Sequence, residues 1–172
     1  IHLNDLEYHE TWTLDDLLRI KCNIDICFQN HLLNKGSIEQ VISKPEQLAL
    51  YTIAFMFNKF HIPIKQNLIF TINSEIEINS GMGSSAACIC SILKCINEHA
   101  NLSLSYDELQ QMGQHIENLI HGTSSGIDIS LSLLGGMVIY NENLISHQQL
   151  KNQCFTVIHT GKSANSTAEC VR

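Results

Sequence analysis

Glycine and serine are concentrated in the run Ser80-Gly81-Met82-Gly83-Ser84-Ser85, which directly precedes a long apolar stretch. Gly81 and Gly83 tolerate positive φ angles, so backbone N–H groups in this run can approach an anion. A following helix would add unpaired N–H groups and the positive end of its dipole, and the hydroxyls of Ser84 and Ser85 can bind a phosphate oxygen or a metal ion. The run predicts a phosphate-binding loop; the alternative is an ordinary glycine turn with a serine N-cap.

Two carboxylates downstream suit phosphoryl transfer. Glu117 could join Ser85 in binding magnesium, because this ion prefers hard oxygen ligands, and phosphates and water would complete its shell. Asp128, eleven residues after Glu117, would orient or accept the proton of an attacking hydroxyl. The alternatives are a solvated helix position for Glu117 and an N-cap role for Asp128. For His121, on the helical face of Glu117, we expect a hydrogen bond to that carboxylate.

The glycine-serine run needs a strand before it and a helix after it. Residues 68–72 are rich in strand formers, and residues 84–99 form an almost unbroken helix-compatible run of small and apolar side chains. We expect this helix to be buried on most sides, with Cys88 and Cys95 acting as small buried hydrophobes.

Other segments predict a mixture of strands and helices, and therefore an α/β or α+β sandwich. A capping box at Ser105 and Glu108 predicts a helix that ends near Gly122. The remaining expectations are an edge strand at 5–12, a short helix capped by Thr13, a helix from Pro45 to about Phe60, a short helix at 129–134, and strands at 137–140 and 155–159.

Composition excludes several classes of protein. At 172 residues and 44% hydrophobic, the chain is one domain, or one domain plus a fragment of another. A net charge of −7 with ten Lys and Arg argues against a nucleic-acid partner, and no apolar stretch reaches the ~20 residues that span a bilayer. Seven cysteines without a CxxC pair predict the reducing cytoplasm, and no Cys/His spacing indicates structural zinc.

Three segments, in the correct order, resemble motifs of the GHMP kinase superfamily, and most closely those of its mevalonate kinase branch. Residues 81–87 are similar to the nucleotide loop GLGSSAA, and residues 117–128 are similar to the segment E…IHGxxSGID. Thr160-Gly161 with Asn165-Ser166-Thr167 resembles the third motif. The resemblance covers roughly residues 68–172, and Ser124 stands where the family often has a proline.

The resemblance implies a fold and a division into domains. The fold would be α+β, a two-layer α/β sandwich that contains a left-handed βαβ unit. Residues 1–150 would form the N-terminal nucleotide-binding domain, and residues 151–172 would begin a second α+β domain. The family's N-terminal lysine segment and its C-terminal glycine-rich motif have no counterpart here, so we expect the central part of a longer enzyme with weak or no activity by itself.

The resemblance also implies roles for individual residues, with ATP and magnesium as cofactors. Ser85 and Glu117 would hold magnesium, Asp128 would be the catalytic carboxylate, and the backbone of Gly81, Met82, Gly83, Ser84 and Ser85 would wrap the phosphates. Thr167 and His121 would face the substrate.

The activity implied by the resemblance is transfer of the γ-phosphoryl of ATP to the primary hydroxyl of a small alcohol. Mevalonate is the first candidate substrate, and its phosphorylation would serve isoprenoid precursor synthesis. The alternatives are a phosphomevalonate or sugar kinase of the same superfamily and a non-catalytic nucleotide-binding domain. Assembly as a homodimer stays open.

Overall fold

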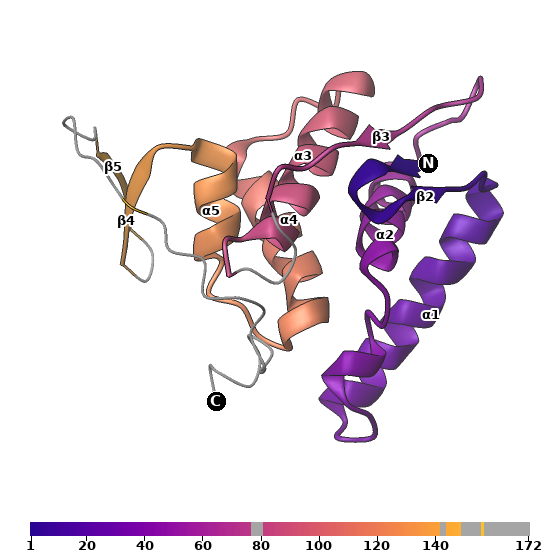
Figure 1. Cartoon of the computed structure of the whole chain (residues 1–172), viewed down its shortest axis with the longest axis horizontal. Coiled ribbons are helices and arrows are strands. Elements are labelled where there is room, and N and C mark those ends of the chain that lie inside the picture. Colours follow the sequence, from indigo (N-terminus) through magenta and orange to yellow (C-terminus); the bar gives the residue numbers. More distant parts are fainter. Residues whose placement is uncertain (77–80, 142–143, 149–155, 157–172) are drawn as a thin grey trace.

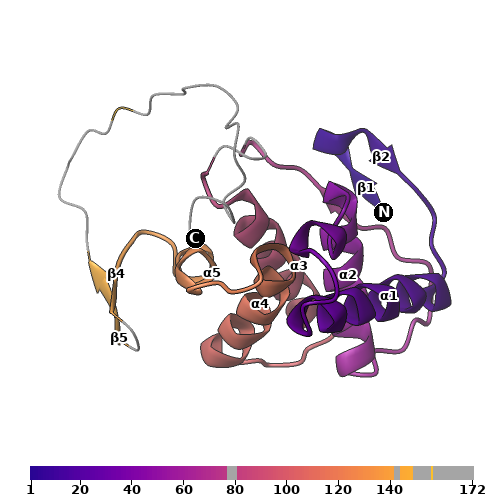
Figure 2. The same ribbon diagram turned by 90° about the horizontal axis from the view of Figure 1, so that it is seen from below.

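The computed structural model describes residues 1–76, 81–141, 144–148 and 156 (Figure 1). In that part, helices carry most of the chain, and short strands and 3-10 helices (η) connect them. In order, the elements are β1 (His2–Leu3), η1 (Asn4–Leu6), β2 (Tyr8–His9), α1 (Leu14–Leu32), η2 (Ile38–Gln40), α2 (Pro45–Lys59), β3 (Thr71–Ile72), α3 (Ser84–His99), α4 (Tyr106–His121), α5 (Ile127–Leu134), β4 (Met137–Asn141) and β5 (Leu144–Gln148). Helices α1 and α2 lie side by side, and α5 lies at the other end of the helical array (Figure 1, Figure 2).

Local sequence signals define the start of three helices. The hydroxyl of Thr13 accepts a hydrogen bond from the N–H of Asp16 (3.1 Å), as predicted for α1. The predicted capping box of α4 is also present, with Ser105 and Glu108 each bonded to the other's backbone N–H. Helix α2 begins at Pro45, whose missing N–H costs nothing in a first turn. These three starts are confirmed.

The prediction of a short helix after Thr13 is wrong, because α1 has 19 residues. Its core face is narrow: only Leu17, Ile24 and Phe28 are buried, and most of its other positions are polar. A helix with so few buried residues gives a weak apolar period in the sequence.

Glycines, and not side-chain caps, precede α3 and α5. Gly83 (φ 70°) is the N-cap of α3, so Ser84 is the first helical residue and the alternative of a serine N-cap is wrong. Gly126 (φ 77°) is the N-cap of α5, which starts two residues earlier than predicted. Asp128 therefore lies inside the first turn, and its alternative as an N-cap is wrong too.

The predicted strands are shorter than their sequence patterns suggest. β1 pairs antiparallel with β2 and parallel with β3. Of the predicted strand 68–72, only Thr71 and Ile72 belong to β3, and the carbonyl of Phe70 just before them accepts a hydrogen bond from the N–H of His2 (2.8 Å). The edge strand expected at 5–12 is wrong over most of its length, because Glu7, directly after η1, has a left-handed backbone (φ 51°) and turns the chain back along β1. The strand at 137–140 is confirmed, as β4, and pairs with β5.

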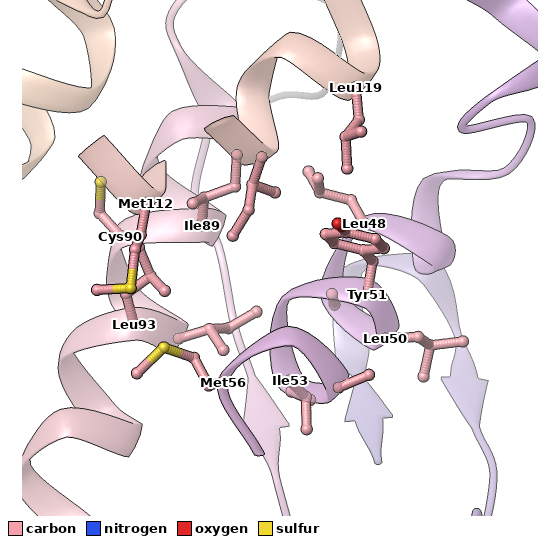
Figure 3. Packing of buried hydrophobic residues seen from close by; sticks show 14 of the residues in the cluster. Leu48, Leu50, Tyr51, Ile53, Met56, Ile89, Cys90, Leu93, Met112 and Leu119 are labelled. Carbon is pink, nitrogen blue, oxygen red and sulfur yellow. The ribbon is translucent and has the colours of Figure 1, made fainter. Parts of the chain in front are cut away.

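The core lies between α2, α3 and α4, with α1 covering the outer side of α2 (Figure 2, Figure 3). Most of α2 is buried, whereas α3 keeps an exposed face that includes Lys94 and Cys95. The expectation that α3 is enclosed on most sides, with Cys95 buried, is therefore wrong. Cys88 is partly buried, and Cys90 is the fully enclosed thiol of this helix.

The mixed α+β class is confirmed in the described part of the chain. Its helices are all too short or too polar to cross a membrane. The predicted strand at 155–159, the third motif and Thr167 lie outside the described residues, apart from Thr156. The expected domain boundary near residue 150 lies outside them as well.

Candidate active site

A cavity of about 690 Å³ opens where the first turns of α2 and α3 face the end of α4. One part of its wall is polar and includes the glycine-serine run and Asp128; another is apolar and includes Leu3, Leu6 and Ile72. The cavity combines an anion-binding loop with room for an apolar group, which is the usual composition of a small-molecule site. The predicted site residues on its wall are Gly81, Gly83, Ser84, Ser85, His121 and Asp128.

The glycine-serine run and Asp128 are neighbours in space. A β-carbon added to Gly83 would lie 3.7 Å from Cγ of Asp128, so the absence of a side chain leaves the carboxylate accessible from the run. Gly81 has a similar positive φ (73°) but open space around it. The side chain of Met82 is 58% exposed, and Met82 is not part of the cavity wall.

The start of α3 presents unpaired donors beside the cavity. Its first intrahelical bond runs from the N–H of Ala87 to the carbonyl of Gly83 (2.9 Å). The N–H groups of Ser84 and Ser85 therefore have no acceptor within the helix, and both residues line the cavity. These donors and the positive end of the helix dipole favour an anion such as phosphate.

Helix α4 fixes the position of Asp128. Gly113 lets α5 approach closely, because a β-carbon there would lie only 2.7 Å from Cγ2 of Ile129. The loop before α5 is also bonded to α4: Nε2 of Gln114 donates to the carbonyl of Ser124 (2.9 Å), and the N–H of Ser124 donates to Oδ1 of Asn118 (2.7 Å). Asp128 is thus held at the cavity by contacts of its neighbours, and its own carboxylate stays exposed.

Glu117 is buried behind this wall. Its side chain is 3% exposed, so the alternative of a solvated helix position is wrong. Burial raises the pKa of the Glu117 carboxyl, Asp128 adds to the increase, and the nearby hydroxyl of Ser124 partly opposes it. Glu117 is not among the residues that line the cavity. A buried acid with a shifted pKa beside a second carboxylate is typical of functional sites.

His121 lines the cavity at the end of α4 and is half-buried. Burial lowers the pKa of its imidazole, and Asp128 partly reverses that shift. His121 makes no hydrogen bond to Glu117, so that expectation is wrong. Its ring is available to a ligand in the cavity.

The donor types at this site fit magnesium. The described residues contain no cluster of three or more His, Cys, Asp or Glu side chains that would hold an ion on their own. Magnesium seldom needs such a cluster, because it is commonly held by one or two protein oxygens together with phosphates and water. The hydroxyl of Ser85 and the carboxylate of Glu117 are of the right chemical kind, and both residues belong to elements that meet at the cavity.

Part of the cavity wall was missed by the sequence analysis. The missed wall residues come from three segments, and a hydrogen bond from the N–H of Ser74 to Oδ2 of Asp5 (2.6 Å) joins the first and last of them. They are Leu3, Asp5, Leu6, residues 42–45, Leu48, Ala49 and residues 72–76. Lys44 is among these residues. No local pattern identifies them, because segments separated by up to about 70 residues meet only in the folded chain.

Comparison with known proteins is consistent with this geometry. Residues 47–136, more than half of the chain, match the family described as GHMP kinases N terminal domain. The chain belongs to the GHMP kinase family. The match includes the glycine-serine run, Glu117, His121 and Asp128.

The relatives of this GHMP kinase chain include proteins named mevalonate kinase. The one from Pyrococcus abyssi is 36% identical over 101 residues, which are 59% of this chain and 30% of that protein. The one from Archaeoglobus fulgidus is 36% identical over 100 residues, 58% of this chain and 34% of the relative. The chain therefore spans about a third of the length of the curated relatives that it matches.

One solved structure shares the fold of this GHMP kinase chain. The crystal structure of the Methanococcus jannaschii mevalonate kinase matches 88% of this chain and 41% of its own chain, with a TM-score of 0.64 and 24% sequence identity. This likeness confirms the predicted fold family.

Proposed function

We propose that this chain forms the nucleotide-binding part of an ATP-dependent kinase that phosphorylates a small alcohol. The observation that carries the proposal is the placement of Asp128 against Gly83, which brings a carboxylate and a phosphate-type loop to one cavity. A kinase needs this arrangement, because phosphoryl transfer depends on positioning the phosphate and the attacking hydroxyl together.

The proposed reaction uses the glycine-serine run to hold the phosphates and Asp128 to position the substrate. Backbone N–H groups of residues 81–85 hold the phosphates at the start of α3. The hydroxyl oxygen of the substrate forms a bond to the γ-phosphorus while the bond to the bridging oxygen breaks and ADP leaves. Asp128 orients this hydroxyl and accepts its proton.

Ser85 and Glu117 are the proposed magnesium ligands. When bound, the ion would offset the negative charge of the phosphates. The raised pKa of Glu117 supports this role, because a cation beside a buried carboxyl would stabilise its ionised form. His121 and Thr167 are the proposed substrate contacts, the second from the family resemblance alone.

Mevalonate is the proposed substrate, because the relatives reported above carry the name mevalonate kinase. We also propose the domain boundary near residue 150 and the reducing cytoplasm as the compartment. The free state of Cys22, Cys27, Cys88, Cys90 and Cys95 in the structure suits that compartment.

A coupled assay of ADP release tests the function. The purified protein is supplied with magnesium and ATP, and with mevalonate, phosphomevalonate or a panel of sugars. The proposal predicts ADP release that depends on mevalonate. Turnover with only one of the other substrates would assign a different kinase of the superfamily, and ATP binding without turnover on any of them by the full-length gene product would favour a non-catalytic domain.

A further inference from the structure

The cavity wall carries an uneven set of charges. Its described side chains include three carboxylates, those of Asp5, Glu75 and Asp128, and one side chain of the Lys or Arg type, that of Lys44. A nucleotide with its phosphates brings further negative charge into this cavity. Magnesium offsets part of this charge, and a lysine on the wall is placed to offset more.

The ammonium group of Lys44 has no partner within the described residues, whereas other lysines of the helical array do. Nζ of Lys21 pairs with Asp25 (2.6 Å), and Nζ of Lys94 donates to the carbonyl of Leu133 (2.8 Å). Nζ of Lys59 lies 5.8 Å from the ring centre of Phe55. Of these four side chains, only Lys44 lines the cavity, and it is exposed there.

The backbone at Lys44 is held in place, so its side chain starts from a defined point. Lys44 is the N-cap of α2, and its N–H donates to Oε1 of Gln47 (3.1 Å). The same oxygen accepts the N–H of Ser43 (2.9 Å), and Pro45 fixes the first turn. Leu48, one turn further along α2, also lines the cavity, so this face of the helix forms part of the wall.

We propose that Lys44 binds the polyphosphate of the nucleotide across the cavity from the start of α3. The nucleotide would thus be held by backbone N–H groups on one side and by a mobile ammonium group on the other. This assignment rests on the proposed kinase function. The assignment extends the proposed function, because Lys44 lies outside every motif identified in the sequence.

A series of ligands with an increasing number of phosphate groups tests the assignment. Binding of adenosine, AMP, ADP and ATP to the full-length protein is measured by calorimetry with magnesium present, for the unchanged protein and for Lys44→Met, Lys44→Arg and Lys35→Met. Lys35 is an exposed lysine away from the cavity and serves as the matched control. We expect Lys44→Met to weaken ATP binding about tenfold. Adenosine binding stays unchanged, Lys44→Arg retains most of the affinity, and Lys35→Met behaves as the unchanged protein.

Two results would overturn the role of Lys44: equal ATP affinity for Lys44→Met and the unchanged protein, or an equal loss of affinity for adenosine and ATP. Failure of the unchanged protein to bind ATP is a separate outcome, because it would overturn the kinase function and the Lys44 assignment together.

Discussion

Asp25 and Asp128 are both aspartates on helices, but their surroundings differ. Asp25 on α1 is fully engaged: it accepts a hydrogen bond from the hydroxyl of Tyr51 (2.7 Å) and pairs with Nζ of Lys21 (2.6 Å). Asp128 on α5 pairs with no cation in the described part of the chain, and its near neighbours are Gly83 and the buried carboxyl of Glu117. The first carboxylate joins two helices, whereas the second faces a cavity.

The difference between Asp25 and Asp128 separates a carboxylate that stabilises the fold from one that is free to act on a ligand. A carboxylate that is paired with both a hydroxyl and an ammonium group stabilises the fold. A buried carboxyl group beside a second carboxylate does the reverse, because burial and the neighbouring charge both disfavour ionisation of the buried group, here Glu117. Such an arrangement is typical of a site that completes its charge balance with a ligand.

The largest expected effect comes from exchanging each aspartate for asparagine. Asp128→Asn should lower kcat of the proposed kinase reaction by about a hundredfold or more, because the amide cannot accept the proton of the hydroxyl. Its thermal unfolding should change little. Asp25→Asn should keep kcat and lower the free energy of unfolding by about 1 kcal/mol. Steady-state kinetics and thermal denaturation measure both quantities, and equal losses of kcat would remove the distinction between the two regions.

Alanine substitutions of Gly83 and Gly81 form a matched pair, and we expect the next largest effect on kcat from the first of them. Alanine at either position adopts a positive φ, at a cost of about 1–2 kcal/mol in stability. Only at Gly83 does the added methyl group reach Asp128. We therefore expect similar loss of stability in the two variants, and a larger loss of kcat in Gly83→Ala. If Gly81→Ala lost as much kcat, the contact between Gly83 and Asp128 would have no special part in catalysis.

A smaller effect is expected from Tyr51→Phe. The Tyr51 side chain is fully buried and its hydroxyl donates to Asp25, so its removal should cost about 1–2 kcal/mol of unfolding free energy. The kcat of the proposed reaction should stay the same, because this hydrogen bond lies between α1 and α2. Urea denaturation measures the first quantity. An unchanged midpoint would show that pairing of Asp25 adds nothing to stability.

Local signals allowed the helix starts and the motifs of the site to be predicted. Thr13, Pro45 and the pair Ser105 and Glu108 each determine a helix start through contacts within four residues, so a sequence reveals them. The glycine-serine run is likewise a local feature, and its place on a cavity wall agrees with the prediction.

The features that were missed depend on contacts between distant segments. Residues 68–70 have strand-forming side chains but lie outside β3, because β1 is only two residues long and its register pairs it with Thr71 and Ile72. The burial of Glu117 follows from the way α3 and α5 pack on α4, which its polar side chain does not reveal. Lys44 enters the cavity wall only because α2 packs against α3.

The most direct test of the central claim is to map where a nucleotide binds. Backbone amide signals of the protein are recorded by NMR before and after addition of magnesium and a non-hydrolysable ATP analogue. The account predicts that the largest shifts fall on Gly81, Gly83, Ser84 and Ser85 and on the start of α5 around Asp128, while amides around Asp25 and Tyr51 stay unchanged. No shifts, or the largest shifts around Asp25 and Tyr51, would contradict it.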